Sequence, residues 1–93
     1  MSRLLVEVDG QTVPLTDCFW VRADKNGCAY GSMVGHAAAT PEQAHLEFTP
    51  RTRERDREVR QGYTIRLLTR EQWRQQAQPC FLGQCKHRKA ATA

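Results

Sequence analysis

The stretch from Cys18 to Val34 reads Cys-Phe-Trp-Val-Arg-Ala-Asp-Lys-Asn-Gly-Cys-Ala-Tyr-Gly-Ser-Met-Val. Its first six residues are rich in aromatic and β-branched side chains, which favour strands. Asn26-Gly27 is the strongest turn signal in the chain, because both residues tolerate the positive φ that a two-residue turn requires. The stretch therefore predicts a β-hairpin in which Lys25 pairs with Cys28 and Cys18 pairs with Gly35.

A second hairpin is predicted on the N-terminal side of this one. Apolar residues alternate with polar ones over positions 4–8, and Asp9-Gly10 then supplies another two-residue turn. The alternation continues on the return strand, where Pro14 marks a sheet edge because it has no N–H to donate to a ladder. Two consecutive hairpins indicate an antiparallel sheet.

The middle of the chain mixes helix and strand signals. Residues 40–43 read Thr-Pro-Glu-Gln, which predicts a helix start with a threonine cap and a proline in the first turn. Because Pro50 follows closely and apolar residues alternate just before it, we expect one helical turn and then a short strand over 45–49. The β-prone run at 63–68 predicts a strand that pairs with it.

Towards the C-terminus, Thr69 and Gln72 repeat the capping pattern and predict a helix towards Gln78 that Pro79 ends. Together these signals predict an α+β fold: a small antiparallel sheet of two β-hairpins plus a later strand pair, with one short C-terminal helix. A chain of 93 residues supports one modest core. We therefore expect a single domain over residues 1–87 and a frayed tail over 88–93.

Charge is distributed unevenly along the chain. Residues 1–50 carry three basic and six acidic side chains, whereas residues 51–93 carry eleven basic and four acidic ones, so the halves have net charges of −3 and +7 and sum to the overall +4. Eleven of the fourteen basic residues are arginines, whose planar guanidinium pairs bidentately with phosphate or carboxylate. The C-terminal half therefore favours nucleic acid or an acidic protein surface as partner.

Five of these arginines, three acidic residues and one apolar residue lie within positions 51–60. A segment with so little apolar surface is expected to form an exposed arm over about 50–61. It has three interpretations: a solvated loop, a basic arm that tracks phosphates, or a segment that folds against a protein partner. The candidate partner-binding residues are Arg51, Arg53, Arg55, Arg57, Arg60, Arg66, Arg70 and Arg74.

Three residues near the C-terminus have side chains that bind zinc. Cys80, Cys85 and His87 lie within eight residues, and thiolates with neutral imidazole are common zinc ligands. The chain lacks a signal-peptide pattern, because acidic residues interrupt its apolar start. We therefore expect a reducing cytoplasm, in which cysteines serve as thiols or metal ligands rather than as disulfides.

The predicted hairpin decides which other cysteine joins this group. Its register separates Cys18 from Cys28 by about 23 Å at the usual strand rise, so at most one of them can share an ion with the C-terminal group. We name Cys18 as the fourth ligand, with His36 as the alternative, and expect Cys28 to lie alone at the hairpin tip. Buried thiols without metal are the competing interpretation.

The sequence carries no catalytic signature. It has no glycine-rich phosphate loop, nucleophile elbow or paired carboxylates, and no apolar run long enough to cross a membrane, so we expect neither an enzyme nor a membrane partner. The aromatic residues Phe19, Trp20, Tyr30 and Trp73 are interpreted as core. The expected function is a small nucleic-acid-binding module. The alternative is a protein-interaction or inhibitor module, such as a mobile-element accessory protein, that binds an acidic partner.

Overall fold

The first hairpin forms as predicted. Strands β1 (Leu5–Val8) and β2 (Gln11–Pro14) pair antiparallel with Val8 opposite Gln11, which leaves Asp9 and Gly10 as a two-residue turn. Both turn residues have positive φ, 50° and 83°. This computed structural model describes residues 4–85, and within them β1 and β2 make a two-stranded sheet separate from the main one.

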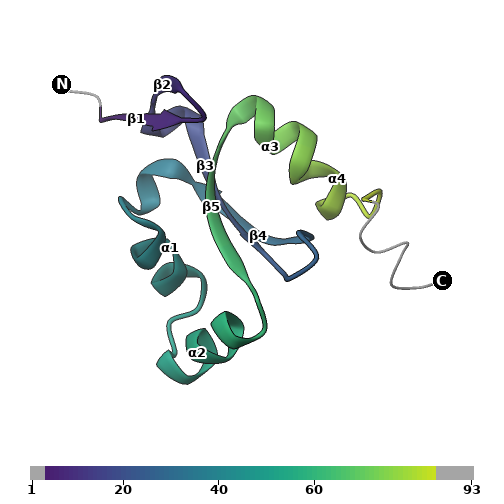
Figure 1. The fold of residues 1–93 in the computed structure, drawn as a ribbon. Coiled ribbons are helices and arrows are strands. Elements are labelled where there is room, and N and C mark those ends of the chain that lie inside the picture. Colours follow the sequence, from purple (N-terminus) through teal and green to yellow (C-terminus); the bar gives the residue numbers. More distant parts are fainter. Residues whose placement is uncertain (1–3, 86–93) are drawn as a thin grey trace.

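The second hairpin, β3 (Cys18–Ala23) with β4 (Ala29–Val34), is the centre of the fold. Phe19 pairs with Val34, which is the register that the sequence predicts. Strand β5 (Thr64–Thr69) pairs with the other edge of β3, so the three-stranded sheet has the order β4-β3-β5 and is antiparallel throughout (Figure 1). The predicted α+β class and the predicted strand at 63–68 are confirmed.

The turn of this hairpin differs from the prediction. The register shifts between Arg22 and Ala23, and the Asp24 N–H then donates to the Cys28 carbonyl at 3.0 Å. Lys25 therefore does not pair with Cys28, and the turn contains three residues instead of two. Gly27, the third of them, has φ 86°, which is the left-handed position that a three-residue hairpin loop requires.

The strand predicted over 45–49 is wrong, because these residues belong to helix α1 (Pro41–Phe48) and to the residue that follows it. Thr40 caps the helix by accepting a hydrogen bond from the Gln43 N–H at 3.1 Å. Ala44 is fully buried and Phe48, one turn later, packs beside it against the main sheet. A helix places this i, i+4 pair on one face, and burial of that face outweighs the strand-like alternation.

The C-terminal helix divides in two. The capping box of Thr69 and Gln72 opens α3 (Arg70–Gln76), as predicted. Pro79 does not end the helical region but lies in the first turn of a further helix, α4 (Gln78–Phe81). A proline is tolerated there because a first-turn N–H has no partner within the helix.

Helices cover both faces of the three-stranded sheet (Figure 1). Trp20 packs with α1 on one face, and its neighbour Val21 packs with residues of α3 and α4 on the other. Helix α2 (Thr52–Arg60) lies beyond α1 at the far end of β5. Two short 3-10 helices, Leu15–Asp17 and Gly35–Ala37, connect the remaining segments.

Candidate metal centre and basic helix

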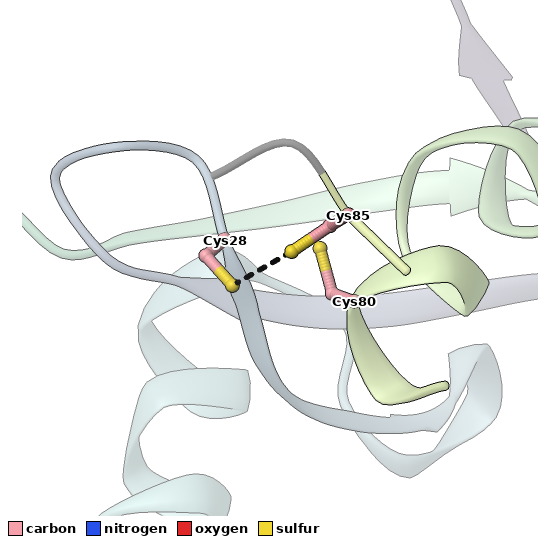
Figure 2. A group of neighbouring side chains, drawn as sticks. All are labelled: Cys28, Cys80 and Cys85. Carbon is pink, nitrogen blue, oxygen red and sulfur yellow. Dashed lines mark hydrogen bonds between the residues drawn. The ribbon is translucent and has the colours of Figure 1, made fainter. Parts of the chain in front are cut away.

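Three cysteine sulfur atoms meet at one end of the main sheet. The Sγ atoms of Cys28, Cys80 and Cys85 all lie within 4.8 Å of one another, and those of Cys28 and Cys85 are 3.7 Å apart (Figure 2). Fifty-seven positions separate Cys28 from Cys85 in the sequence. The fold therefore brings two remote segments together at a group of soft, metal-compatible ligands.

Each cysteine is positioned by a different local feature. Cys28 follows the hairpin turn, and its N–H donates to the Asp24 carboxylate at 2.9 Å. Cys80 lies in α4, over the sheet. The chain then turns back through Gly83, which has φ 74°, and the Gln84 N–H donates to the Pro79 carbonyl at 2.8 Å. This turn directs the Cys85 side chain towards the other two.

The three thiols are enclosed by apolar side chains. Cys28, Cys80 and Cys85 have exposed fractions of 1%, 0% and 5%, and they pack with Val21 and Leu68 in one core cluster. None of the four cysteines, all of which lie in the described range 4–85, is in a disulfide. Enclosure of this kind keeps water away from the sulfur atoms, as in closed structural metal sites.

One of the three sulfur–sulfur distances matches that expected around a tetrahedral ion. With zinc–sulfur bonds of about 2.3 Å, two sulfur ligands of a tetrahedral ion lie about 3.8 Å apart. The 3.7 Å between Cys28 and Cys85 matches this spacing. Cavity-lining residues beside the cluster include Cys85, Pro79 and the exposed Arg66, and the cavity volume is about 480 Å³. The positive charge of the Arg66 guanidinium would offset the net negative charge of a zinc ion bound by three thiolates.

Cys18 does not belong to this group. It lies at the opposite end of β3, six residues before Asp24, which corresponds to about 20 Å along a strand. Its thiol contacts the Pro14 carbonyl at 3.6 Å. Burial, and then the charge of Asp17, raise the pKa of the Cys18 thiol, which opposes the thiolate form that metals bind.

Cys28 therefore occupies the place predicted for Cys18, and the expectation that Cys28 lies alone is wrong. Cys18 and Cys28 are nevertheless too far apart to share an ion, as predicted, since only one of them reaches the C-terminal pair. His36 is exposed in the second 3-10 helix, outside the group. His87 lies outside the described residues. No local pattern marks Cys28, because its role depends on where α4 packs.

The segment predicted as a basic arm is helix α2, and it is attached through an acidic residue. The Glu58 carboxylate accepts hydrogen bonds from the Arg22 guanidinium at 3.2 Å, from the His45 ring at 2.8 Å and from the Thr49 hydroxyl at 2.8 Å. Only 16% of the Glu58 side chain is exposed. The guanidinium of Arg22 also lies 5.6 Å from the centre of the Phe48 ring. These contacts fasten the polar helix to the sheet and to α1.

This network changes the acidity of Glu58. Burial alone would raise the pKa of the carboxyl group, because it disfavours the charged form. Hydrogen bonds from His45 and Thr49 and the positive charge of Arg22 act in the other direction and outweigh it. The pKa of Glu58 is therefore lowered from its ordinary value, and the carboxylate is the form that holds α2 in place.

Arg55 has a structural role as well. One of its Nη atoms donates to the carbonyl oxygens of Thr49 and Pro50 at 2.9 and 2.6 Å, and the other donates to the Thr52 hydroxyl at 3.0 Å. It thereby joins the end of α1 to the start of α2. Arg55 is half-buried, whereas the arginines of this segment were expected to be exposed.

Three other arginines form the outer face of α2, which consists of Arg53, Arg57 and Arg60. They are spaced i, i+4 and i+7, so they share one side of the helix, and all three are exposed. Asp56 is on the same side, whereas Glu58 is turned inward. Arg51 is exposed and lies 3.8 Å from Glu54. The alternation of arginines and acids in the sequence thus becomes a face with an excess of positive charge.

The remaining candidate arginines lie elsewhere. Arg70 and Arg74 are exposed on α3, and Arg66 is exposed on β5 and donates to the Gln76 side chain at 3.4 Å. Helices α2 and α3 are at opposite ends of β5 (Figure 1). The fold therefore does not gather the eight predicted arginines into one surface.

No protein-family model, curated protein or solved structure matches this chain. Within residues 4–85, no helix combines the length and the apolar character needed to cross a membrane.

Proposed function

We propose that this protein is a small, non-enzymatic binding module that a zinc ion stabilises and that binds nucleic acid on the outer face of α2. The proposal of a zinc ion rests on three buried sulfur atoms that lie within 4.8 Å of one another. The nucleic-acid part is supported by the exposure of three arginines on one helix face while the neighbouring Glu58 faces inward.

Cys28, Cys80 and Cys85 would be the thiolate ligands of zinc. Three thiolates and one imidazole make a common closed, structural zinc site. We propose His87 as the fourth ligand on its sequence position alone, two residues after Cys85. A closed site has no open coordination position for substrate, which agrees with a structural ion rather than a catalytic one. A reducing cytoplasm, where thiols remain available, is the compartment that we propose.

Elemental analysis tests the metal. Protein purified without chelator should contain about one zinc per chain, and Cys80→Ser should lose it because a hydroxyl is a poor zinc ligand. Cys18→Ser is the matched control, a buried cysteine at the other end of β3, and should retain the metal. If the wild-type protein holds no metal and all four thiols are alkylated in the folded state, the zinc site is refuted.

Nucleic acid is the partner that we favour for the outer face of α2. Arginine binds phosphate oxygens bidentately, and such contacts release counterions from the nucleic acid. The spacing of Arg53, Arg57 and Arg60 supports up to three phosphate contacts from one helix. An acidic protein surface would satisfy the same charges and is the alternative, in which case the module would act as an inhibitor or accessory protein.

The salt dependence of binding separates these partners. The triple variant Arg53→Ala, Arg57→Ala, Arg60→Ala should weaken binding to a mixed-sequence DNA or RNA and reduce the slope of log K against log salt by up to about three. The double variant Arg70→Ala, Arg74→Ala removes charge from α3 and should have a smaller effect. Unchanged binding in the triple variant would refute the α2 site. Loss of one protein complex with unchanged nucleic-acid binding would favour the acidic protein partner.

A further inference from the structure

An exposed tyrosine lies on β4, an outer strand of the main sheet within residues 4–85. Arg22 pairs with Gly31 and Ala23 pairs with Ala29, so Tyr30 is the extra residue of a β-bulge in β4. A bulge interrupts the alternation of side chains and redirects the residue that it inserts. The Tyr30 side chain is 48% exposed, so the expectation that this residue belongs to the core is wrong.

Tyr30 stacks on the only other tyrosine of the chain. The rings of Tyr30 and Tyr63 have centroids 6.4 Å apart and an interplanar angle of 24°. Tyr63 comes three residues after α2, and its N–H donates to the Glu58 carbonyl at 2.9 Å. The aromatic pair is therefore connected through the backbone to the helix that carries the exposed arginines.

Tyr63 lines a surface cavity of about 460 Å³ in which two of the other lining residues, Lys25 and Arg60, are basic. Lys25 lies against the turn after α2, since a Cβ added at Gly62 would come within 3.0 Å of the Lys25 Cβ. Asp24 also lines the cavity, but one of its carboxylate oxygens accepts the backbone N–H groups of Asn26 and Cys28 at 2.9 Å each. One carboxylate oxygen of the acidic residue that lines this cavity is therefore already hydrogen-bonded within the hairpin turn.

We propose that Tyr30 and Tyr63 form a stacking site for unpaired bases, and that the phosphates of the same single strand lie on Lys25 and on the outer face of α2, which includes Arg60. Surfaces that bind single-stranded nucleic acid combine a basic track with aromatic rings on which bases stack. Bases within a duplex are stacked on each other and are not available to a protein ring. The aromatic pair therefore selects single strands, whereas the arginines alone do not.

This inference rests on the proposed nucleic-acid binding and adds the class of ligand. Labelled oligothymidylate, oligouridylate and a DNA duplex are titrated with wild-type protein and with Tyr30→Leu, which removes the ring. Tyr30→Phe retains the ring. Phe81→Leu is the matched control, because Phe81 is an aromatic residue of α4 that is 43% exposed and stacks on Trp73 rather than on either tyrosine.

Loss of the Tyr30 ring should weaken single-strand binding by about 5- to 150-fold, the range measured for one base–aromatic stack. Binding of the duplex should change by less than about twofold, since the phosphate contacts remain. Tyr30→Phe and Phe81→Leu should bind single strands nearly as wild type does. Circular dichroism confirms that each variant is folded.

Nuclear magnetic resonance gives a second readout that does not depend on affinity. The chain has two tyrosines, so ring-selective labelling yields two sets of ring signals. Both sets should shift upfield when oligothymidylate is added, because a stacked base lies over the ring, and neither should shift with the duplex.

Two results would overturn the proposal. If folded Tyr30→Leu binds single strands as wild type does, while the triple α2 variant has lost affinity, the stacking site is refuted and the proposed nucleic-acid binding remains. If wild-type protein binds neither single strands nor duplex, the proposed function fails and the stacking site fails with it.

Discussion

Glu58 is one of three acidic residues between positions 51 and 60, and nothing in the sequence distinguishes it from Glu54 or Asp56. In the fold it is the residue that joins α2 to Arg22, His45 and Thr49. An acidic residue that would repel phosphate if exposed is instead used to hold the helix. The positive charge of the outer face depends on this inward position.

The lowered pKa of Glu58 predicts a specific acid sensitivity. Its contribution to stability is fully present above the ordinary carboxyl pKa of 4.5 and is lost as the pH falls through the lower folded-state value. Urea denaturation from pH 7 to pH 3 should therefore show wild type more stable than Glu58→Gln at pH 7, with the difference shrinking below about pH 4.5.

Glu54→Gln is the control for this experiment, because Glu54 is exposed and its pair with Arg51 at 3.8 Å is a surface contact worth little. It should follow the wild-type pH curve closely. Equal stability of wild type and Glu58→Gln at every pH would mean that the carboxylate does not hold α2.

Helix α2 has almost no apolar surface of its own to bury against the rest of the fold. It has one apolar residue, Val59, which is 64% exposed, so burial of an apolar face contributes little to it. Polar contacts at its start and along its inner side replace that face. Arg55 joins it to α1, and Glu58 joins it to the sheet.

Substitution of Arg55 and of Arg53 should therefore have different effects on stability, although both remove an arginine from α2. Arg55→Ala removes hydrogen bonds from a charged donor to the Thr49 and Pro50 carbonyls and should lower the free energy of unfolding by about 1.5–3 kcal/mol. Arg53→Ala removes an exposed side chain and should change it by about 0.5 kcal/mol or less. Chemical denaturation measures both, and equal effects would contradict the structural role of Arg55.

For the residues of helix α1, the local alternation of apolar residues favours a strand, whereas the packing favours a helix. Leu46 and Phe48 alternate as in a strand, while Ala44 and Phe48 are spaced as in a helix. Short segments carry both signals, and only the surface that receives them decides. Here Trp20 and its neighbours on the sheet accept the Ala44–Phe48 face, and Leu46 is left 48% exposed.

At the scale of the whole molecule, the cysteine cluster connects the hairpin turn to the C-terminal helices. Cys28 belongs to the hairpin, and Cys80 and Cys85 belong to α4 and the turn that follows it. An ion held by all three would cross-link segments that are 57 positions apart. Its main effect would be to fix α4 on the sheet, because the hairpin ladder has its own hydrogen bonds.

Removal of zinc should therefore destabilise the region around α4 and the hairpin turn more than the rest of the protein. At a zinc concentration 1,000 times Kd, binding adds about 4 kcal/mol of stability, so chelation should lower Tm by about 16 °C or more. Hydrogen exchange after chelation should increase most at residues 77–85 and around Cys28, and least in the pairing of β3 with β5. Cys18→Ser should respond as wild type does, and an unchanged Tm on chelation would contradict the cross-link.

Turns and helix starts in this protein follow from a few neighbouring residues. Asp9-Gly10 and the glycine of Asn26-Gly27 produce their turns because few other residues adopt positive φ. Thr40 and Thr69 begin their helices because their side chains satisfy N–H groups that have no partner within the helix. Each of these signals acts over a few neighbouring residues, so it can be recognised without knowing the rest of the fold.

The contacts between distant residues depend on how the whole chain packs. This packing selected Cys28 rather than Cys18 for the thiol cluster, helix rather than strand for α1, and the inner or outer side of α2 for each charged residue. The physical reason is the same in all three cases. A side chain's partners depend on which surfaces are buried against each other, and that burial is a property of the whole chain rather than of the few residues around it.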